Sequence, residues 1–266
     1  MTLTAALRAF SGIQKRELLR FVQQRERFFA ALVRPLVWLI VFAAGFRAAL
    51  GISIIPPYQT YITYDTYVVP GLIGMIQLFN GMQSSLSMVY DREMGSMRVL
   101  LTSPLPRWFL LFARLAAGTT VSIFQAYAFL LVAGLLGIRM PPLGYCAVLP
   151  ALILSGLMLG AFGLMLSSAI RQLENFAGVM NFVIFPMFFL SSALYPLWKM
   201  QESSQILNAI CTLNPFTYAV ELIRFALYMQ WNGLAALVVA ASLAVFAVLA
   251  VLGYDPRHAM VRRQTN

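Results

Sequence analysis

The sequence predicts an all-α integral membrane protein with six transmembrane helices. Of its 266 residues, 61% are hydrophobic and only 11% are charged, a balance that soluble domains of this size do not have. Apolar runs of roughly 20 residues recur along the chain, and each could cross a hydrocarbon core about 30 Å thick. The runs are continuous rather than alternating, and backbone groups in lipid must bond within their own segment. Helices are therefore predicted, and not barrel strands.

The distribution of basic residues predicts how these helices are oriented. The six apolar runs cover residues 30–50, 68–89, 112–138, 146–168, 176–197 and 233–253. If the N-terminus is cytoplasmic, the inside segments hold 15 of the 19 Lys and Arg residues. We therefore expect both termini on the cytoplasmic side of a bacterial inner membrane. The net charge of +10 then needs no nucleic-acid partner.

The first 29 residues predict a cytoplasmic helix that lies in the membrane interface. One stripe at helical spacing holds its apolar residues, which are Leu3, Leu7, Phe10, Leu18, Phe21 and Phe28. Arg16, Arg20 and Arg27 lie on the far side of the helix. Lipid headgroups favour a helix of this kind, so membrane lipids are expected partners. No cleavable signal peptide is expected here.

The stretch 198–232 predicts an outer helical hairpin. Its second apolar part, residues 215–230, is too short and too charged to cross the bilayer, and a seventh crossing would place the basic tail outside. We expect two half-helices, about 203–212 and 216–229, that dip into the outer leaflet and return. The residues singled out in this re-entrant region are Asn214, Pro215, Tyr218, Glu221 and Arg224. Glu221 and Arg224 are three apart and are expected to pair.

The segment 90–107, between the second and third spans, predicts a short charged helix on the inner surface. It would run from Asp91 to about Leu101 and stop before Pro104 and Pro106. A stiff helix there could receive a push from a soluble partner. The candidate contact residues are Asp91, Arg92, Glu93, Met94, Gly95, Met97, Arg98 and Leu100.

Polar residues inside the predicted spans have two interpretations. Those singled out are Gln77, Asn80, Ser84 and Ser87 on one face of the second span, and Gln125 in the third. They could hydrogen-bond between helices, or they could line a translocation pathway. The tyrosines of the outer loop 51–67 could likewise form an aromatic belt or line an exit route. In the fourth span, Gly156, Gly160 and Gly163 predict close helix packing.

The search for chemistry gives no catalytic residue and no metal site. The sequence contains no Gly-rich phosphate loop followed by Lys-Ser or Lys-Thr. The single histidine, His258, lies in the basic tail, which leaves no Ser-His or Cys-His pair in the membrane. The predicted topology also places no carboxylate at mid-bilayer, where ion-driven carriers need one. The chain is therefore not expected to be an enzyme, and energy for transport would come from outside it.

Three segments carry a resemblance to a known family. They are Arg-Pro-Leu-Val-Trp-Leu at 34–39, the charged stretch at 91–107, and Leu-Asn-Pro-Phe-Thr-Tyr-Ala-Val-Glu-Leu-Ile-Arg at 213–224. The chain resembles the permease subunit of type 2 ABC transporters, in the drug-exporter-like branch, over essentially its whole length. It would thus be a single permease domain, residues 1–266.

The resemblance implies a role for each segment. The helix at 91–101 would couple to a separate ABC ATPase subunit, which would bind the ATP, and this chain would bind no cofactor itself. The outer re-entrant pair would close the extracellular end, and two copies would form the export pathway as a homodimer. An ATPase-coupled membrane assembly or biogenesis factor, which transports no soluble substrate, is the alternative function.

Overall fold

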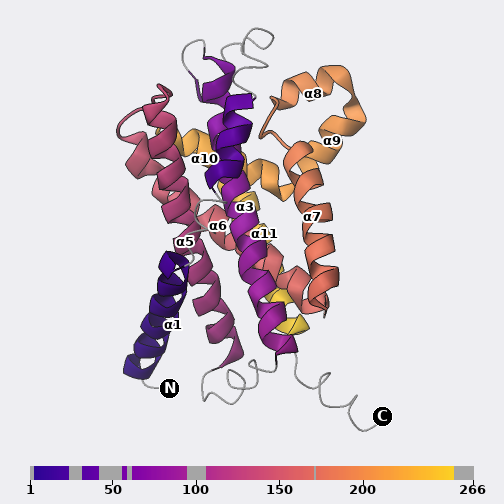
Figure 1. Ribbon diagram of the computed structural model, residues 1–266. Coiled ribbons are helices and arrows are strands. Elements are labelled where there is room, and N and C mark those ends of the chain that lie inside the picture. Colours follow the sequence, from indigo (N-terminus) through magenta and orange to yellow (C-terminus); the bar gives the residue numbers. More distant parts are fainter. Residues whose placement is uncertain are drawn as a thin grey trace.

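The computed structural model describes residues 3–23, 32–41, 56–58, 62–94, 106–170 and 172–254 (Figure 1). These residues form helices joined by short turns. The helices are α1 (Leu3–Gln23), an unlabelled helix Leu32–Val41, α3 (Tyr64–Glu93), α5 (Arg107–Leu135), α6 (Gly144–Ala169), α7 (Leu173–Phe189), α8 (Leu197–Ser203), α9 (Gln205–Leu213), α10 (Pro215–Leu227) and α11 (Gly233–Gly253). The predicted all-α class is confirmed for the described part of the chain.

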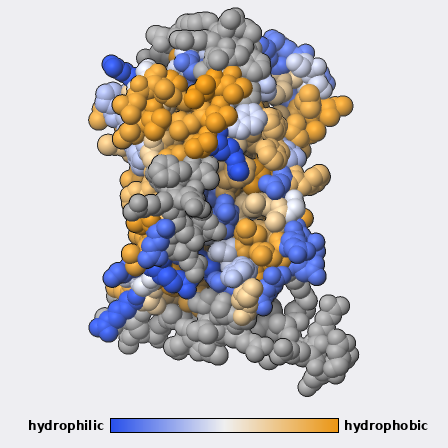
Figure 2. All heavy atoms as spheres, viewed as in Figure 1, coloured by the Kyte–Doolittle hydropathy of each residue, from blue (hydrophilic) through white to orange (hydrophobic). Residues whose placement is uncertain are grey.

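The long helices α3, α5, α6, α7 and α11 run along the length of the molecule (Figure 1). Helix α1 lies beside one half of α5, at the end where α3 and α11 finish, and we call this the inner end. Helices α8, α9 and α10 lie at the opposite, outer end. Figure 2 shows hydrophobic residues gathered toward the outer end of one face and hydrophilic residues along α1.

Three helices of the described residues are long and apolar enough to cross a membrane. They are Trp108–Leu135 in α5, Gly144–Ala169 and Gly233–Gly253. Helices α9 and α10 pass the same test only as a pair, and a 76° bend separates them. Leu173–Phe189 and Leu32–Val41 are shorter apolar helices. The described residues therefore contain three spans by length and composition, or four with the bent pair, and the full set of six stays a prediction.

Glycine packing at the centre of the bundle is confirmed. A side chain at Gly81 of α3 would lie 2.9 Å from the Leu159 carbonyl oxygen and 3.0 Å from the Gly160 Cα on α6. A side chain at Gly163 would lie 2.8 Å from the Gly81 carbonyl oxygen, and one at Gly156 would lie 2.9 Å from Thr119 Cγ2. Because real Cβ atoms do not approach so closely, Gly81 and Gly163 let α3 and α6 meet nearly backbone to backbone, and Gly156 lets the Thr119 side chain of α5 pack directly on α6.

Two predicted boundaries were wrong. The fifth apolar run was expected to continue to residue 197, but α7 ends at Phe189 and a separate helix, α8, begins at Leu197. Ser191 favours the break, since its hydroxyl donates to the Phe188 carbonyl at 2.6 Å and accepts from the Ala193 amide at 3.2 Å. The half-helices predicted near 203–212 and 216–229 correspond closely to α9 and α10.

The second correction concerns Asp91. It does not begin a new helix, because α3 continues without interruption to Glu93. Met88 and Val89 are buried like the apolar residues before them, and no proline or glycine interrupts the helix between Tyr90 and Glu93. Asp91, Arg92 and Glu93 therefore form the last turn of α3.

Candidate functional site: the two ends of helix α3

At the inner end, Asp91 joins α3 to α5. Its Oδ2 accepts a hydrogen bond from Arg114 Nη2 at 2.7 Å, and the same nitrogen lies 3.0 Å from Ser87 Oγ. The side chain of Arg114 is only 6% exposed and that of Asp91 is 18% exposed. Arg114 is thus a largely buried cation on α5 whose charge is balanced by α3.

Arg92 joins α3 to the end of α6. Its Nη2 donates to the Ser167 carbonyl oxygen at 2.7 Å and its Nη1 to the Ile170 carbonyl oxygen at 3.4 Å. The guanidinium carbon also lies 5.0 Å from the centre of the Tyr254 ring, just after α11. The last carbonyls of a helix carry partial negative charge, so a cation is stabilised at this place.

Glu93 joins α3 to the start of α7. Its Oε1 accepts a hydrogen bond from the Leu173 amide at 2.8 Å, in the first turn of that helix. Amides at a helix start lack an intrahelical partner and favour a nearby anion. Three consecutive charged residues of α3 therefore connect it to α5, α6 and α7.

Met94 follows this turn and is exposed at 63%. It caps the end of α3, and the chain then enters the part of the inner segment that lies outside the described residues. Gly95, Met97, Arg98 and Leu100, the other candidate contact residues, belong to that part. Of the predicted coupling residues, the structure thus brings together Asp91, Arg92, Glu93 and Met94 at one end of one helix.

The polar residues in the middle of α3 bond to neighbouring helices. Gln77 donates to the Leu152 carbonyl oxygen at 2.7 Å and accepts from the Ser155 hydroxyl at 2.6 Å, both on α6. Asn80 donates to Gln125 on α5. These bonds agree with the interpretation that polar residues within the spans hydrogen-bond between helices.

The serines of the same stripe lie closer to the inner end. Ser87 donates to the Ser84 carbonyl at 2.7 Å, and Ser84 lies in the α3–α5 contact near Gly118. The cavity between α3, α5 and α6, lined by Gln77, Ser84 and Ser122 among others, measures only about 10 Å³. At most one water fits such a volume, so this space in a single chain does not accommodate cargo.

At the outer end, two buried tyrosines fix α3 to the turn that follows α7. Tyr64 donates to the Leu194 carbonyl oxygen at 2.9 Å, and Tyr67 donates to the Ser192 carbonyl oxygen at 3.0 Å. Each is 1% exposed. A side chain at Gly71, one turn later, would overlap the backbone of Ala193. For these two tyrosines the aromatic-belt interpretation was wrong, because they face protein and not the interface.

Arg224 on α10 completes the outer contact. It is 2% exposed, it forms the predicted ion pair with Glu221, and its Nη2 donates to the Ser192 carbonyl oxygen at 2.8 Å. Its guanidinium carbon lies 4.1 Å from the centre of the Tyr67 ring. Burial raises the pKa of the neighbouring Tyr58 phenol to about 12.

The sharp bend between α9 and α10 is also held by side chains. Asn214 accepts from the Phe216 amide at 3.0 Å, which caps α10, and donates to the Met187 and Leu190 carbonyls at 2.8 and 2.7 Å. Pro215 occupies the first position of α10, where it displaces no helical hydrogen bond. Tyr218 is partly buried against the main core. The hairpin is therefore attached to the end of α7.

Sequence reasoning missed several residues of these two contacts. Arg114, Ser167 and Tyr254 at the inner end, and Ser192 at the outer end, were not singled out, and Tyr64 and Tyr67 were assigned a different role. Arg114 had a detectable signal, since an arginine within an apolar run requires a partner. The backbone carbonyls that accept these bonds have no signal in the sequence.

Comparison with known proteins identifies the family. The model of the ABC-2 type transporter family matches residues 8–228. This chain belongs to that family. It is therefore a transmembrane transport permease, and members of this kind are transport subunits and not enzymes. The predicted resemblance is confirmed.

Named relatives agree with this assignment. The chain is 29% identical to the putative transport permease ycf38 of Cyanophora paradoxa, over 77% of this chain and 70% of that protein. It is 27% identical to the ycf38 protein of Porphyra purpurea, over 85% and 76% of the two chains. It is 32% identical to the probable multidrug ABC transporter permease YbhR of Escherichia coli K12, over 66% of this chain and 49% of that protein.

Proposed function

We propose that this chain is the membrane-spanning subunit of an ATP-driven exporter. A separate ABC ATPase subunit binds its inner end, and two copies of the chain form the translocation pathway. The observation that carries the proposal is the last turn of α3. Asp91, Arg92 and Glu93 connect it to α5, α6 and α7 immediately before the chain enters the inner segment 95–105.

This arrangement suits a permease whose movement is driven by a separate subunit. A helix is stiff along its axis, so a displacement of the inner segment would pass directly to α3. The three charged contacts would pass it on to the neighbouring helices, as a rigid-body movement of packed elements. Membership of the ABC-2 type transporter family supports an ATPase partner. The sequence also contains no phosphate-binding loop of its own. ATP therefore binds to the partner subunit.

The closed interior of one chain favours a pathway between two copies. The polar residues Gln77, Asn80 and Gln125 are occupied by interhelical bonds, and the nearby cavity holds about one water. Exposed aromatic residues on α7, namely Phe182, Phe185 and Phe189, offer an apolar face for a second copy. In a dimer the polar stripe could become accessible when the helices separate.

The outer hairpin closes the pathway at the opposite end. Helices α9 and α10 are too short to cross singly, and their 76° bend suits a segment that enters the outer leaflet and returns. The charge distribution supports a cytoplasmic position for the inner end, in a bacterial inner membrane. Helix α1 then lies at the cytoplasmic interface, where its basic residues meet lipid headgroups.

Met94 offers the sharpest test of the ATPase contact. It is exposed, and its side chain is not needed for the three charged contacts of α3. Met94→Glu would place a charge in an apolar contact, so we expect it to reduce co-purification of the ATPase at least tenfold. Met94→Leu is the matched control and should leave co-purification unchanged.

The same variants separate docking from folding. Membrane insertion and thermal stability of Met94→Glu should equal those of the original chain. Sealed vesicles that contain both subunits should accumulate a lipophilic dye when ATP is supplied. Undiminished co-purification and dye uptake with Met94→Glu would contradict this docking site, and ATP hydrolysis without any uptake would favour an assembly factor.

A further inference from the structure

Arg34 is a cation near mid-height of the bundle. It lies in the helix Leu32–Val41, which Figure 1 draws in indigo against α3. Its guanidinium carbon lies 4.0 Å from the centre of the Phe79 ring on α3. At 1.5 Å per residue, Phe79 is about 22 Å from either end of α3. The count of basic residues assigned Arg34 to the inner segments, whereas the structure places it beside the middle of a long helix.

The guanidinium of Arg34 contacts the face of Phe79 and, within the described part of the chain, forms no hydrogen bond or ion pair. The residue is also exposed on the single chain. Arg114 and Arg224, by contrast, are at most 5% exposed, and each pairs with a carboxylate. An arginine inside a membrane is costly to hold against lipid and normally faces protein or water. Arg34 is therefore expected to face the interior of the assembled permease.

Arg34 borders the side of the molecule that we assign to a second copy. Trp38 lies one turn after Arg34 on the same side of the helix. Its ring contacts those of Phe188 and Phe189 on α7, with centres 6.1 and 5.7 Å away. Phe189 stacks on Phe185, one turn nearer the inner end, with ring centres 6.3 Å apart. A second copy against α7 would thus bring two Arg34 side chains, one from each copy, to the same pathway.

The described residues offer no carboxylate at this height. Their acidic side chains lie toward the inner end or at the outer end, and they are Glu17, Asp91, Glu93, Glu174, Asp65, Glu202 and Glu221. Two arginines that face one pathway without such a partner attract anions, as rings of basic side chains do in anion pores. A resident phospholipid does not supply this anion, because its phosphate stays about 15 Å from the middle of the bilayer. The arrangement therefore favours an anionic group on the exported molecule.

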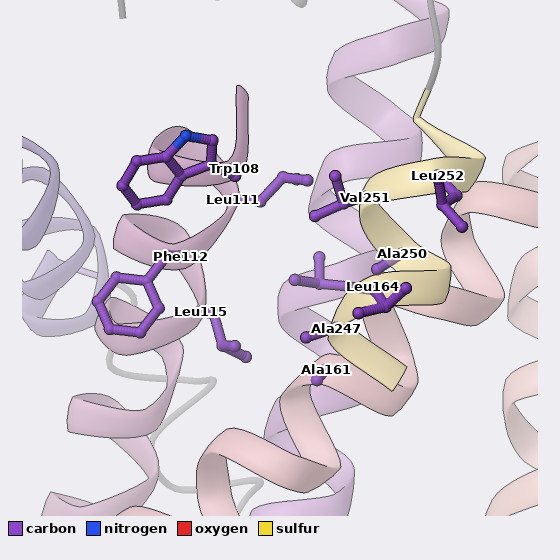
Figure 3. Close-up of a pocket in the computed structure, with 11 residues that line it drawn as sticks. Trp108, Leu111, Phe112, Leu115, Ala161, Leu164, Ala247, Ala250, Val251 and Leu252 are labelled. Carbon is purple, nitrogen blue, oxygen red and sulfur yellow. The ribbon is translucent and has the colours of Figure 1, made fainter. Parts of the chain in front are cut away.

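The apolar groove between α5 and α11 gives no such selectivity. Figure 3 shows its lining side chains, among them Trp108, Leu115 and Leu164, around a cavity of about 440 Å³. None of the side chains that line it is charged. Selection by charge therefore belongs to Arg34 and not to this groove.

We propose that Arg34 of each copy binds the anionic group of the cargo midway along the pathway, so that the exported molecule is an amphipathic anion. The site rests on the proposed function, since it places Arg34 in a pathway between two copies. The planar guanidinium donates to two oxygens of a sulfonate, carboxylate or phosphate. Phe79 holds the cation at this height, and the exposed rings of Phe182 and Phe185 receive the apolar part of the cargo.

Quenching of Trp38 by brominated amphiphiles tests the site without the ATPase. Trp108, Trp198 and Trp231 are replaced by Phe in the full chain, which leaves Trp38 as the only tryptophan. The protein in phosphatidylcholine vesicles is titrated with a bromoalkyl sulfonate and with a bromoalkyl trimethylammonium of equal chain length. We expect the sulfonate to bind about tenfold more tightly, as one charge-assisted contact would provide.

Substitutions of two arginines give a matched comparison. Arg34→Gln removes the charge at the site and should abolish the preference for the sulfonate. Arg139→Gln removes the same charge from the exposed turn between α5 and α6, and should leave the preference unchanged. Arg34→Lys keeps the charge and should keep most of the preference. Phosphatidylglycerol added to the vesicles should not compete, because its phosphate stays at the headgroup level.

Three results would overturn the proposal. The first is equal binding of the sulfonate and the ammonium by the original chain. The second is an unchanged preference in Arg34→Gln. The third is an equal loss in Arg34→Gln and Arg139→Gln, which would show a general effect of net charge.

Transport assays separate this site from the proposed function. With the ATPase and ATP present, we expect an anionic amphipathic dye to accumulate faster than a cationic one, and Arg34→Gln to remove the difference. Equal accumulation of both dyes would overturn the cargo assignment and leave the exporter in place. A sulfonate preference without ATP-driven accumulation of any dye would support the anion site and contradict the exporter.

Discussion

The two ends of helix α3 are attached to the bundle by different chemistry. At the outer end the contacts are made by neutral phenols and one deeply buried guanidinium, and Tyr64, Tyr67 and Arg224 are at most 2% exposed. At the inner end the contacts are made by Asp91, Arg92 and Glu93, which lie partly or fully at the surface. The same helix is thus held by burial at one end and by accessible charge at the other.

The difference shows which end can rearrange at low cost. Breaking the outer contact would leave a buried cation and buried hydroxyls without partners, which is expensive. At the inner end, Arg92 and Glu93 are near water and can exchange partners, since solvent compensates for a lost contact, and only the pair of Asp91 with Arg114 involves a buried charge. A helix built in this way would pivot about its outer end while its inner end moves. Four sets of substitutions test that asymmetry, from the largest expected effect to the smallest.

Arg224→Met should have the largest effect. It leaves Glu221 without its cation and removes the bond to the Ser192 carbonyl, so we expect a loss of about 3–5 kcal/mol in the free energy of unfolding. Thermal unfolding in detergent measures it. Glu221→Gln combined with Arg224→Met removes both charges and should lose less. Equal losses in the single and double variants would show that the ion pair is not what stabilises this end.

Gly71→Ala should have the next largest effect on stability. Its Cβ would overlap the backbone of Ala193, which forces the turn after α7 away from α3, and we expect a loss of about 1–3 kcal/mol. Gly178→Ala is the control, because a Cβ there meets nothing within 4 Å, and it should gain up to about 1 kcal/mol from helix propensity. If both variants unfold at the same temperature, the close approach at Gly71 has no energetic role.

Asp91→Asn should have a smaller effect on stability and a larger one on coupling. Arg114 keeps Ser87 as a partner but loses its carboxylate, which costs about 1–2 kcal/mol. We expect ATP hydrolysis by the complex to continue while dye transport falls. The exchange Asp91→Arg with Arg114→Asp rebuilds the pair and should restore transport in part. Full transport in Asp91→Asn would contradict a role for this contact.

Glu93→Gln should have the smallest effect. The side-chain oxygen of the new glutamine still accepts from the Leu173 backbone N–H, but it no longer places a charge at the start of α7. We therefore expect a loss of about 0.5 kcal/mol in the free energy of unfolding. Unfolding measured at low and at 1 M salt checks the cause, because the difference from the original chain should vanish at high salt. A difference that persists at high salt would indicate lost packing instead of lost charge.

The long elements could be predicted because apolar runs and breakers are local signals. The runs at 146–168 and 233–253 coincide closely with α6 and α11. The same signal did not distinguish a buried helix from an exposed one. In the apolar window of α6, 61% of residues are buried, against 17% for α11. The glycines of α6 were the useful clue, since close approach needs small residues.

The functional ends were harder to predict, because they depend on contacts between distant segments. The pairing of Glu221 with Arg224 follows from a spacing of three on a helix. The bonds from Tyr67 and Arg224 to the Ser192 carbonyl join residues more than 30 positions apart, through a backbone atom that every residue has. No pattern in a single sequence marks such an acceptor.

Reconstitution tests the central claim most directly. The chain is placed in sealed vesicles alone, with its ATPase subunit, or with an ATPase variant that cannot hydrolyse ATP, and accumulation of a lipophilic fluorescent dye against its gradient is recorded. Our account predicts uphill accumulation only when the active ATPase and ATP are both present. Uphill accumulation by the chain alone, or equal accumulation with the inactive ATPase, would contradict it.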